Sequence, residues 1–523
     1  MVISLKDYKN KVKGCWLGKN IGGTLGMPFE GFRGCLDLDW YTQDMSKGAA
    51  ANDDLDLQLV WLVAAEKYGK NLDAKILAEY WTSYIFPSWS EYGMAKANLT
   101  KGILPPLSGW YNNFHKDSCG AFIRSEIWAC LAPGHPEIAI KYAYEDAIVD
   151  HVDEGVYAEI FCAAVQSAAF VESDAETLIN IGLSYIPADS GVAKSVKLAI
   201  ECYKNGLDWK AARKKVLQTF PGTFVFHGAI GGVFEEDIPM GEPGYDAPGN
   251  IGIIIIGWLY GEGDFGKSIC IATGCGEDAD CTAATLGAIL GIVLGADKIP
   301  EKWIEPIGDE INTMCIDATG WDMWHPNTVT DLTRRICNLM PTFMGEHCEA
   351  LDDSGVIIKV REPKDLYDGD TNLERFGHYV SFKDGLLKQP PFGIAVKSMP
   401  FDIVFRCVDG LNVVNEKEIK FEIDITNNSA KPQWLELNWI LPEEWEVSTG
   451  RSFSVNMGAV RPAGAINPGG FPKVPVTVIP HNITQAEYTV VLEVSSLGRP
   501  NKQYVHIQLF NHPEIGSFVK FDA

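Results

Sequence analysis

Residues 276–294 read GEDADCTAATLGAILGIVL, and this stretch decides how the first part of the chain folds. From Ala283 onward it is apolar all round, which predicts a helix buried at the centre of a bundle. Glu277, Asp278 and Asp280 stand directly before that helix. Three carboxylates beside such an apolar helix are unfavourable without compensation, and capping of the helix can hardly satisfy all of them. A cation site is therefore the better explanation of this cluster.

The rest of the chain divides near residue 350 into two parts with different periodicity. Up to about residue 345 the apolar residues recur at helical spacing, as in 55–68 and 156–171. Beyond about residue 352 they alternate, as in 419–425, 434–439, 474–479, 488–494 and 504–509. We therefore expect a multidomain α and β protein. Its parts are an all-α bundle at 1–350, a segment at 351–400 that either connects the domains or adds strands, and an immunoglobulin-like β-sandwich at 401–523.

Composition and charge limit the partners of the chain. The 523 residues are 46% hydrophobic and 22% charged, typical of a globular protein with a large core. A net charge of −25 repels phosphate backbones and anionic membranes, which argues against nucleic acid and membrane partners. The N-terminal MVISLKDYKNKVK lacks the apolar region of a secretory signal, and the apolar run 251–259 is too short to span a bilayer. Together with 13 scattered cysteines, interpreted as reduced thiols, these features predict a cytoplasmic protein.

Asn52, Asp53 and Asp54 form a second acidic cluster, at the start of an amphipathic helix. Taken alone, this cluster is best explained as a helix N-cap, with Asn52 as the capping residue and the acids at the positive end of the helix dipole. Adjacent carboxylates nevertheless repel each other. Mg²⁺ would relieve that repulsion, because it binds carboxylate and amide oxygens.

The two clusters and the motifs around them resemble the ADP-ribosylglycohydrolase family over about residues 8–345. Asn52-Asp53-Asp54 is similar to the family's Thr-Asp-Asp motif, and Asp264-Phe265 followed by 276–281 resembles its closing Asp-x-Asp-Thr signature. Residues 120–124, GAFIR, resemble its small-residue-plus-arginine helix. The family's opening glycine-rich helix and loop are matched in this sequence by Gly14, Gly18, Gly22, Leu25, Gly26, Pro28, Glu30 and Gly31, which resemble it. The resemblance implies an orthogonal bundle of helices that hydrolyses a glycosidic bond at a ribosyl or related sugar.

The resemblance also implies roles for individual residues. One or two Mg²⁺ ions, with Mn²⁺ or Ca²⁺ as alternatives, would be held by Asn52, Asp53, Asp54, Asp278 and Asp280, with Cys281 at the same site. Glu30 or Asp54 would act as general base while the ions orient the sugar hydroxyls and a water. The candidate substrate-binding residues are Gly120, Arg124, His151 and Asn250. The implied substrate is a small-molecule or protein-linked glycoside, with ADP-ribosyl groups as the family's substrate class; the oligomeric state stays unknown.

Four positions depart from the family's pattern. Gly23 stands where many members have aspartate, and Glu277 where they usually have glycine. Asn52 replaces a threonine hydroxyl by an amide oxygen, which Mg²⁺ accepts readily. Cys281 replaces a hydroxyl, and a thiol is a poor magnesium ligand, so one of two ion sites could be weakened or lost. The alternative function is therefore a non-catalytic metal- and ligand-binding protein that retains the fold. An intact cleft with Glu30 facing it would favour catalysis.

Other candidates have a simpler structural explanation. His151 precedes a buried helix, where a lone histidine is more often structural than substrate-binding. The aromatic rings of 81–92 (WTSYIFPSWSEY) could stack on a base or sugar, but packing explains most of them. In the second domain, 441–445 (LPEEW) resembles a turn-and-tryptophan segment of immunoglobulin-like domains. A domain that braces the helical one is favoured there over a carbohydrate-binding role.

Overall fold

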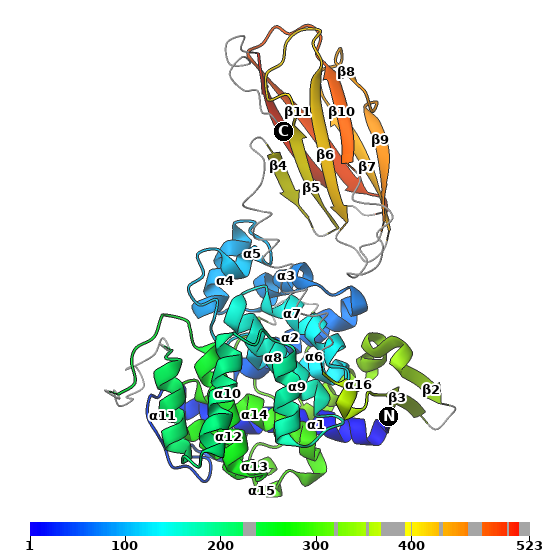
Figure 1. Cartoon of the computed structure of the whole chain (residues 1–523). Coiled ribbons are helices and arrows are strands. Elements are labelled where there is room, and N and C mark those ends of the chain that lie inside the picture. Colours follow the sequence, from blue (N-terminus) through cyan, green and yellow to red (C-terminus); the bar gives the residue numbers. More distant parts are fainter. Residues whose placement is uncertain are drawn as a thin grey trace. The chain divides into compact units, whose positions relative to one another are not determined.

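The computed structural model describes residues 1–222, 237–317, 323–351, 355–367, 393–398, 400–427, 432–458, 473–498 and 502–511. The chain forms two compact units, Met1–Phe376 and Gly377–Ala523 (Figure 1). The first is mainly helical and the second is made of strands. The boundary between them falls inside the segment 351–400, where the sequence predicts a connection.

The helical pattern of the first part of the sequence is confirmed by sixteen α-helices in the described residues. None of them combines the length and the apolar composition needed to cross a membrane. The predicted helices 55–68, 156–171 and 283–294 correspond to α2, α8 and α14. The helices are α1 Leu5–Gly26, α2 Asp53–Tyr68, α3 Ala74–Tyr84, α4 Ser90–Thr100, α5 Leu107–Trp110, α6 Ser125–Leu131, α7 Pro136–Ala147, α8 Asp153–Ala168, α9 Ala175–Ser184, α10 Gly191–Lys204, α11 Trp209–Thr219, α12 Ala247–Gly261, α13 Phe265–Gly274, α14 Ala279–Leu294, α15 Glu301–Ile304 and α16 Val329–Met344.

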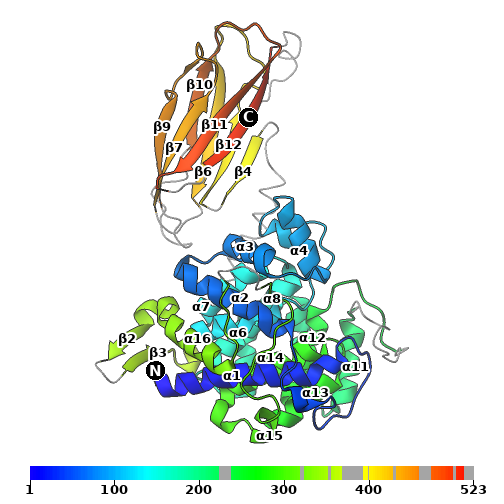
Figure 2. The ribbon, with the colours of Figure 1, turned by 180° about the vertical axis from the view of Figure 1, so that it is seen from behind.

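Helices α1 and α14 share the most extensive helix contact of this unit and run antiparallel, side by side (Figure 2). Their backbones touch because glycines face the contact. A Cβ added to Gly14, Gly18 or Gly22 would lie 1.9 to 2.2 Å from a carbonyl oxygen of α14. One more turn along, a Cβ on Gly26 would lie 2.4 Å from Ala279 O. The glycines of the opening motif therefore hold the C-terminal end of α1 against the N-terminal end of α14, where the acidic residues 277–280 lie.

Part of the predicted connecting segment belongs to the helical unit. Strand β3 (Gly355–Lys359) pairs antiparallel with β2 (Cys348–Leu351) and with β1 (Val2–Ile3), in the order β1-β3-β2. Another part, β4 (Gly393–Lys397), pairs with the first long strand of the second unit. The segment thus adds strands to both units, and its residues 368–392 lie outside the described part.

The second unit is a sandwich of two antiparallel sheets, as the alternating pattern predicts. One sheet has the order β4-β5-β6-β10-β8 and the other β12-β11-β7-β9. Trp439 contacts the rings of Phe405 and Phe421 from the opposite sheet, at centroid distances of 6.0 and 6.5 Å. The strands are β5 Phe401–Cys407, β6 Ile419–Asn427, β7 Gln433–Ile440, β8 Glu446–Val447, β9 Ser452–Met457, β10 Lys473–Ile479, β11 Glu487–Ser496 and β12 Lys502–Phe510.

Two features of the sandwich follow directly from its sequence. Pro475 lies on β10 opposite Glu422 of β6, and among the described residues β8 pairs with β10 only at Val478 and Ile479. At Pro475 the strand is thus an edge, where a missing N–H does no harm. Trp445 is 2% exposed and donates to His481 O at 3.0 Å, so this tryptophan packs inside its own unit.

Candidate metal centre and active site

Both acidic clusters sit at the N-termini of helices that meet at one cavity. Asp53 and Asp54 begin α2, and Asp278 and Asp280 flank the first residue of α14. The cavity has a volume of about 540 Å³. Its walls are formed by Met27, Glu30, Ala51, Asn52, Asp53, Trp89, Ser90, Glu91, Tyr92, Ser118, Cys119, Gly120, Ile123, Asp278, Asp280, Cys281 and Met314.

The buried oxygens of this site fit a cation. Asp54, Asp278 and Asp280 are 1%, 2% and 3% exposed, and each has one carboxylate oxygen without a hydrogen-bond partner. One donor atom each from Asp54, Asp280 and Cys281 lie within 4.8 Å of one another. Buried carboxylates that lack hydrogen bonds are costly unless an ion compensates them. The donor set consists mainly of carboxylate oxygens, with one thiol.

Asn52 holds the two clusters together in this arrangement. Its side-chain oxygen accepts a hydrogen bond from Asp54 N at 2.8 Å, so Asn52 is the N-cap of α2. Its amide nitrogen donates to Asp280 Oδ2 at 3.1 Å. The capping explanation and the metal-site explanation of this cluster are therefore compatible. The amide bridges the helix end to an aspartate of the other cluster.

The electrostatics of the cavity favour ion binding. Burial, followed by repulsion from Glu30 and Asp53, raises the pKa of Asp280 to about 8. Burial also raises the pKa of Asp54 and of Asp278 well above the usual range. Several neighbouring carboxylates cannot all ionise cheaply in a desolvated site. A divalent cation supplies the charge that lets them do so.

Lys19 is a buried partner of this site that the sequence reasoning missed. Its ammonium group is 1% exposed and lies 3.4 Å from Asp54 Oδ2 and 3.2 Å from Glu126 Oε1. Burial alone would lower the pKa of Lys19, but the carboxylates of Glu126 and Asp54 outweigh burial and raise it above the usual range. Lys19 therefore stays charged and offsets part of the negative charge behind the cavity. Its only sequence signal is a lysine inside a run of small and apolar residues, 16–26.

Glu30 lines the cavity at the end of the α1 loop. Burial, followed by Asp53 and Asp54, raises the pKa of Glu30 to about 7. The loop is tied to the second acidic cluster by backbone hydrogen bonds from Gly31 N to Glu277 O (2.8 Å) and from Glu277 N to Phe32 O (2.7 Å). The Glu277 side chain turns to Arg33, which donates to it at 2.8 and 3.2 Å. Glu277 thus anchors the Glu30 loop rather than adding a carboxylate to the cavity.

The four predicted substrate-binding residues occupy different places. Gly120 lines the cavity, and a Cβ there would lie 2.0 Å from Glu91 Oε1. Asn250 is buried behind it, and its side-chain oxygen accepts from Asp278 N at 3.2 Å, so Asn250 positions the second cluster. Arg124 and His151 are both fully buried and are not among the cavity-lining residues.

Arg124 and His151 form a charged network behind the cavity. Arg124 donates to both oxygens of Asp150, at 3.0 and 2.8 Å, and to Asp146 at 2.9 Å. His151 Nδ1 lies 2.8 Å from Asp150 Oδ1, and its Nε2 lies 3.9 Å from Glu91 Oε1. Arg124 also donates to the backbone oxygen of the cavity-lining Gly120 at 2.5 Å, whereas His151 lies next to the cavity-lining Glu91. The motif match indicated this region, but the long-range pairing of Arg124 with Asp150 could not be predicted from spacing.

Other cavity residues come from the aromatic stretch 81–92 and from the loop before α16. Tyr92 donates to Asp53 Oδ2 at 2.9 Å, and Trp89 is 43% exposed. Trp81, in contrast, is fully buried. Asp56 accepts from Met314 N at 2.6 Å and so holds the loop that brings Met314 to the cavity wall. The stretch 81–92 thus supplies an exposed ring at the cavity, Trp89, as well as core packing by Trp81.

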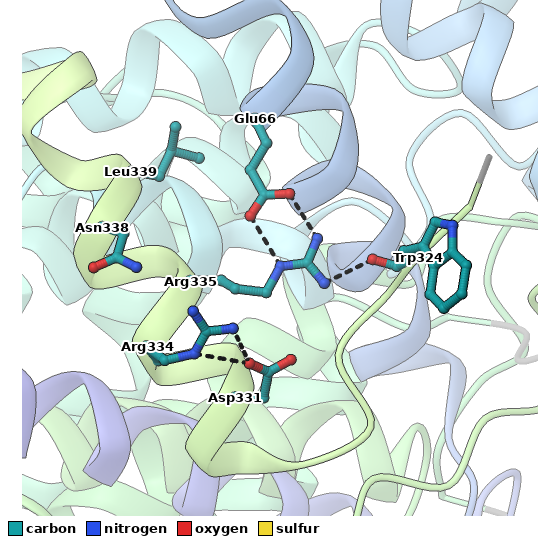
Figure 3. A pocket seen from close by; sticks show the side chains of 7 residues that line it. All are labelled: Glu66, Trp324, Asp331, Arg334, Arg335, Asn338 and Leu339. Atoms are coloured by element: carbon teal, nitrogen blue, oxygen red, sulfur yellow. Dashed lines mark hydrogen bonds and ion pairs between the residues drawn. The ribbon is translucent and has the colours of Figure 1, made fainter.

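A second hollow, of about 450 Å³, has no residue of the acidic clusters among its described lining residues (Figure 3). Arg335 forms a two-pronged ion pair with Glu66, at 2.9 and 2.6 Å, and Arg334 pairs with Asp331. The ring of Trp324 stands exposed at its edge (Figure 3). Because each of these charges already has an opposite partner, the hollow shows no sign of chemistry.

Comparison with known proteins agrees with this geometry. The family model described as ADP-ribosylglycohydrolase matches residues 4–332. This range spans α1 through the start of α16 and contains both acidic clusters. Among curated proteins, none is similar enough to the chain to count as a match. The chain belongs to the ADP-ribosylglycohydrolase family, a family of hydrolytic enzymes.

Proposed function

We propose that this protein is a magnesium-dependent hydrolase that cleaves a glycosidic bond at a ribosyl or related sugar, in an ADP-ribosyl conjugate or another glycoside. The observation that carries the proposal is the meeting of both acidic clusters and Glu30 at one cavity of about 540 Å³. Two buried aspartate oxygens of its lining, one on Asp278 and one on Asp280, lack a hydrogen-bond partner. A cavity of that size accommodates a sugar and part of its aglycone.

The residues fit one or two divalent ions. Asp53, Asp54, Asp278 and Asp280 would hold them, since their oxygens suit Mg²⁺, and Mn²⁺ or Ca²⁺ are alternatives. Cys281 donates its thiol hydrogen to Asp54 Oδ1 at 3.3 Å and suits a softer ion better than magnesium. When bound, the ion supplies positive charge that orients sugar hydroxyls and stabilises charge as the bond breaks.

Glu30 is the better of the two candidate catalytic carboxylates. It lines the cavity, and a pKa of about 7 lets it exchange a proton near neutral pH. Asp54 is 1% exposed and already contacts Lys19 and Cys281. We therefore assign proton transfer between water and substrate to Glu30, and ion binding to Asp54. Trp89 offers a ring on which the substrate can stack.

The alternative function is a binding protein without catalytic activity. It predicts an intact ion site and no catalytic role for Glu30. Glu30→Gln separates the two, since it keeps the shape of the side chain and removes the exchangeable proton. We expect at least about a hundredfold loss of turnover, within the range of general acid–base catalysis, with magnesium affinity nearly unchanged. Full activity of the variant would remove Glu30 from the mechanism.

The ion assignment has its own test. Calorimetric titration with Mg²⁺ should show binding that disappears in Asp280→Ala and in Asp53→Ala. Asp44→Ala is a matched control, because Asp44 is an exposed aspartate whose hydrogen bonds go to Ser46. Magnesium binding that survives in both cavity variants would reject the site.

A further inference from the structure

The charge of the cavity walls points to a substrate class. Five carboxylate residues line the cavity, namely Glu30, Asp53, Glu91, Asp278 and Asp280. None of the lining residues that the structure describes is a lysine or an arginine. Bound divalent ions would offset the aspartates that hold them. Glu91 is not among those ligands, so bound ions would not contact its carboxylate.

Glu91 occupies the place where the cavity could otherwise offer donors to an anion. Ser118, in the small-residue segment 118–120, donates its hydroxyl to Glu91 Oε2 at 3.1 Å. Gly120 has no side chain, and Glu91 Oε1 fills the space where its Cβ would be, 2.0 Å away. The donor hydroxyl and the open backbone of this segment thus face a carboxylate. An incoming phosphate would meet the same negative charge.

In the network behind Glu91, no hydrogen bond from Arg124 or His151 reaches the Glu91 carboxylate among the described residues. The guanidinium of Arg124 is shared between Asp146 and Asp150, and His151 lies between Asp150 and Glu91. Glu91 itself is 6% exposed, so its charge is poorly screened by water. These contacts fix the carboxylate in the wall as a hydrogen-bond acceptor. A carboxylate so placed accepts from sugar hydroxyls and repels phosphate oxygens.

We propose that the substrate is an uncharged glycoside, whose sugar hydroxyls hydrogen-bond to Glu91 and whose ring stacks on Trp89, and that Glu91 excludes phosphate-bearing substrates such as ADP-ribosyl groups. This inference rests on the proposed glycoside hydrolysis and narrows its substrate. Glu91 is then a specificity-determining residue of the cavity. The net charge of the whole chain, −25, acts in the same direction at longer range.

A turnover comparison tests the substrate class. Full-length protein with Mg²⁺ is given ADP-ribosylated arginine and serine peptides, and a panel of uncharged 4-nitrophenyl furanosides and pyranosides. We expect at least one uncharged glycoside to be cleaved with a kcat/KM at least about tenfold above that of every ADP-ribosyl substrate. Faster cleavage of an ADP-ribosyl substrate would overturn the inference and leave the proposed hydrolysis standing. No cleavage of any member would reject both.

A binding experiment tests Glu91 itself. Glu91→Gln keeps an acceptor oxygen for the Ser118 hydroxyl and removes the negative charge. The affinity of the variant for free ADP-ribose should therefore be at least about tenfold higher than that of the unaltered protein. Its affinity for an uncharged methyl ribofuranoside should change little. Glu262→Gln, at an exposed residue paired with Lys267, is the control for net charge and should leave both affinities unchanged. Equal ADP-ribose affinity in Glu91→Gln and the unaltered protein, with the melting temperature preserved, would refute the role of Glu91.

Discussion

A glycine in the contact between α1 and α14 can be replaced by alanine to test the packing. The substitution has two opposite effects on stability, because it raises the helix propensity and overpacks the contact. Replacing Gly22 by alanine in the middle of a helix gains about 1 kcal/mol of propensity. The added Cβ would, however, lie 2.1 Å from Ala283 O and 2.6 Å from Ala284 N. Ordinary contact begins at 3.4 Å, so the two backbones must move apart by more than an ångström.

The size of the effect follows from these two terms. Overpacking of a tight core costs about 1–3 kcal/mol or more, and the upper part of that range applies because the contacted atoms are backbone. After the gain in propensity, Gly22→Ala should lower the free energy of unfolding by about 2 kcal/mol. The displaced end of α14 should also weaken magnesium binding, since Asp278 and Asp280 move with it.

Gly23→Ala is a matched control on the same helix. It gains the same propensity, and its Cβ would meet a side chain rather than backbone, the amide nitrogen of Asn52 at 2.9 Å. Moving Asn52 would disturb the cap of α2 and the bond to Asp280, at a cost of about 1 kcal/mol that offsets the gain in propensity. Urea unfolding followed by the helical signal in circular dichroism should therefore rank Gly22→Ala well below Gly23→Ala. Equal or higher stability of Gly22→Ala would refute the account of the glycine contact.

Two further predictions concern charge. Lys19→Met leaves the carboxylates of Asp54 and Glu126 buried without their cation. In the same urea experiment it should lower the free energy of unfolding by about 3–5 kcal/mol. A decrease of less than about 1 kcal/mol would contradict the role of Lys19. Because the pKa of Asp280 is raised to about 8 without an ion, magnesium must displace a proton below that pH. Apparent magnesium affinity should thus rise with pH between 6 and 8, by up to about tenfold per pH unit for each displaced proton. Calorimetry in buffers of different ionisation enthalpy should show the release of that proton. An affinity that does not change with pH would show that Asp280 is already ionised.

The sequence predicted the helical unit and the acidic clusters well, because both depend on local signals. The apolar run after Asp280 marks α14, and the carboxylates before it lie at the cavity as a candidate ion site. The strands of the sandwich were equally visible as alternation, for example in β6, where every second residue is buried. Gly14, Gly18 and Gly22 stood out in the sequence only as part of the opening motif, and their close packing against α14 is seen in the structure.

What the sequence could not show depends on contacts between distant segments. Lys19 matters because it meets Asp54 and Glu126, and nothing in their separate contexts links them. Glu91 looked like one more acid in an aromatic stretch, and its place in the cavity depends on Gly120. The connecting segment was hard to assign because its strands pair with different units, β3 with β1 and β4 with β5.

The pairing of α1 with α14 also bears on when the protein becomes functional during its own synthesis. The two helices stand near opposite ends of the helical unit's sequence, so α1 emerges from the ribosome long before its partner. Until α14 arrives, the glycine face of α1 has no backbone to pack against. The proposed ion site, which needs residues from both ends, is then among the last features to form. A nascent chain that stops short of residue 279 should be unable to retain a cation.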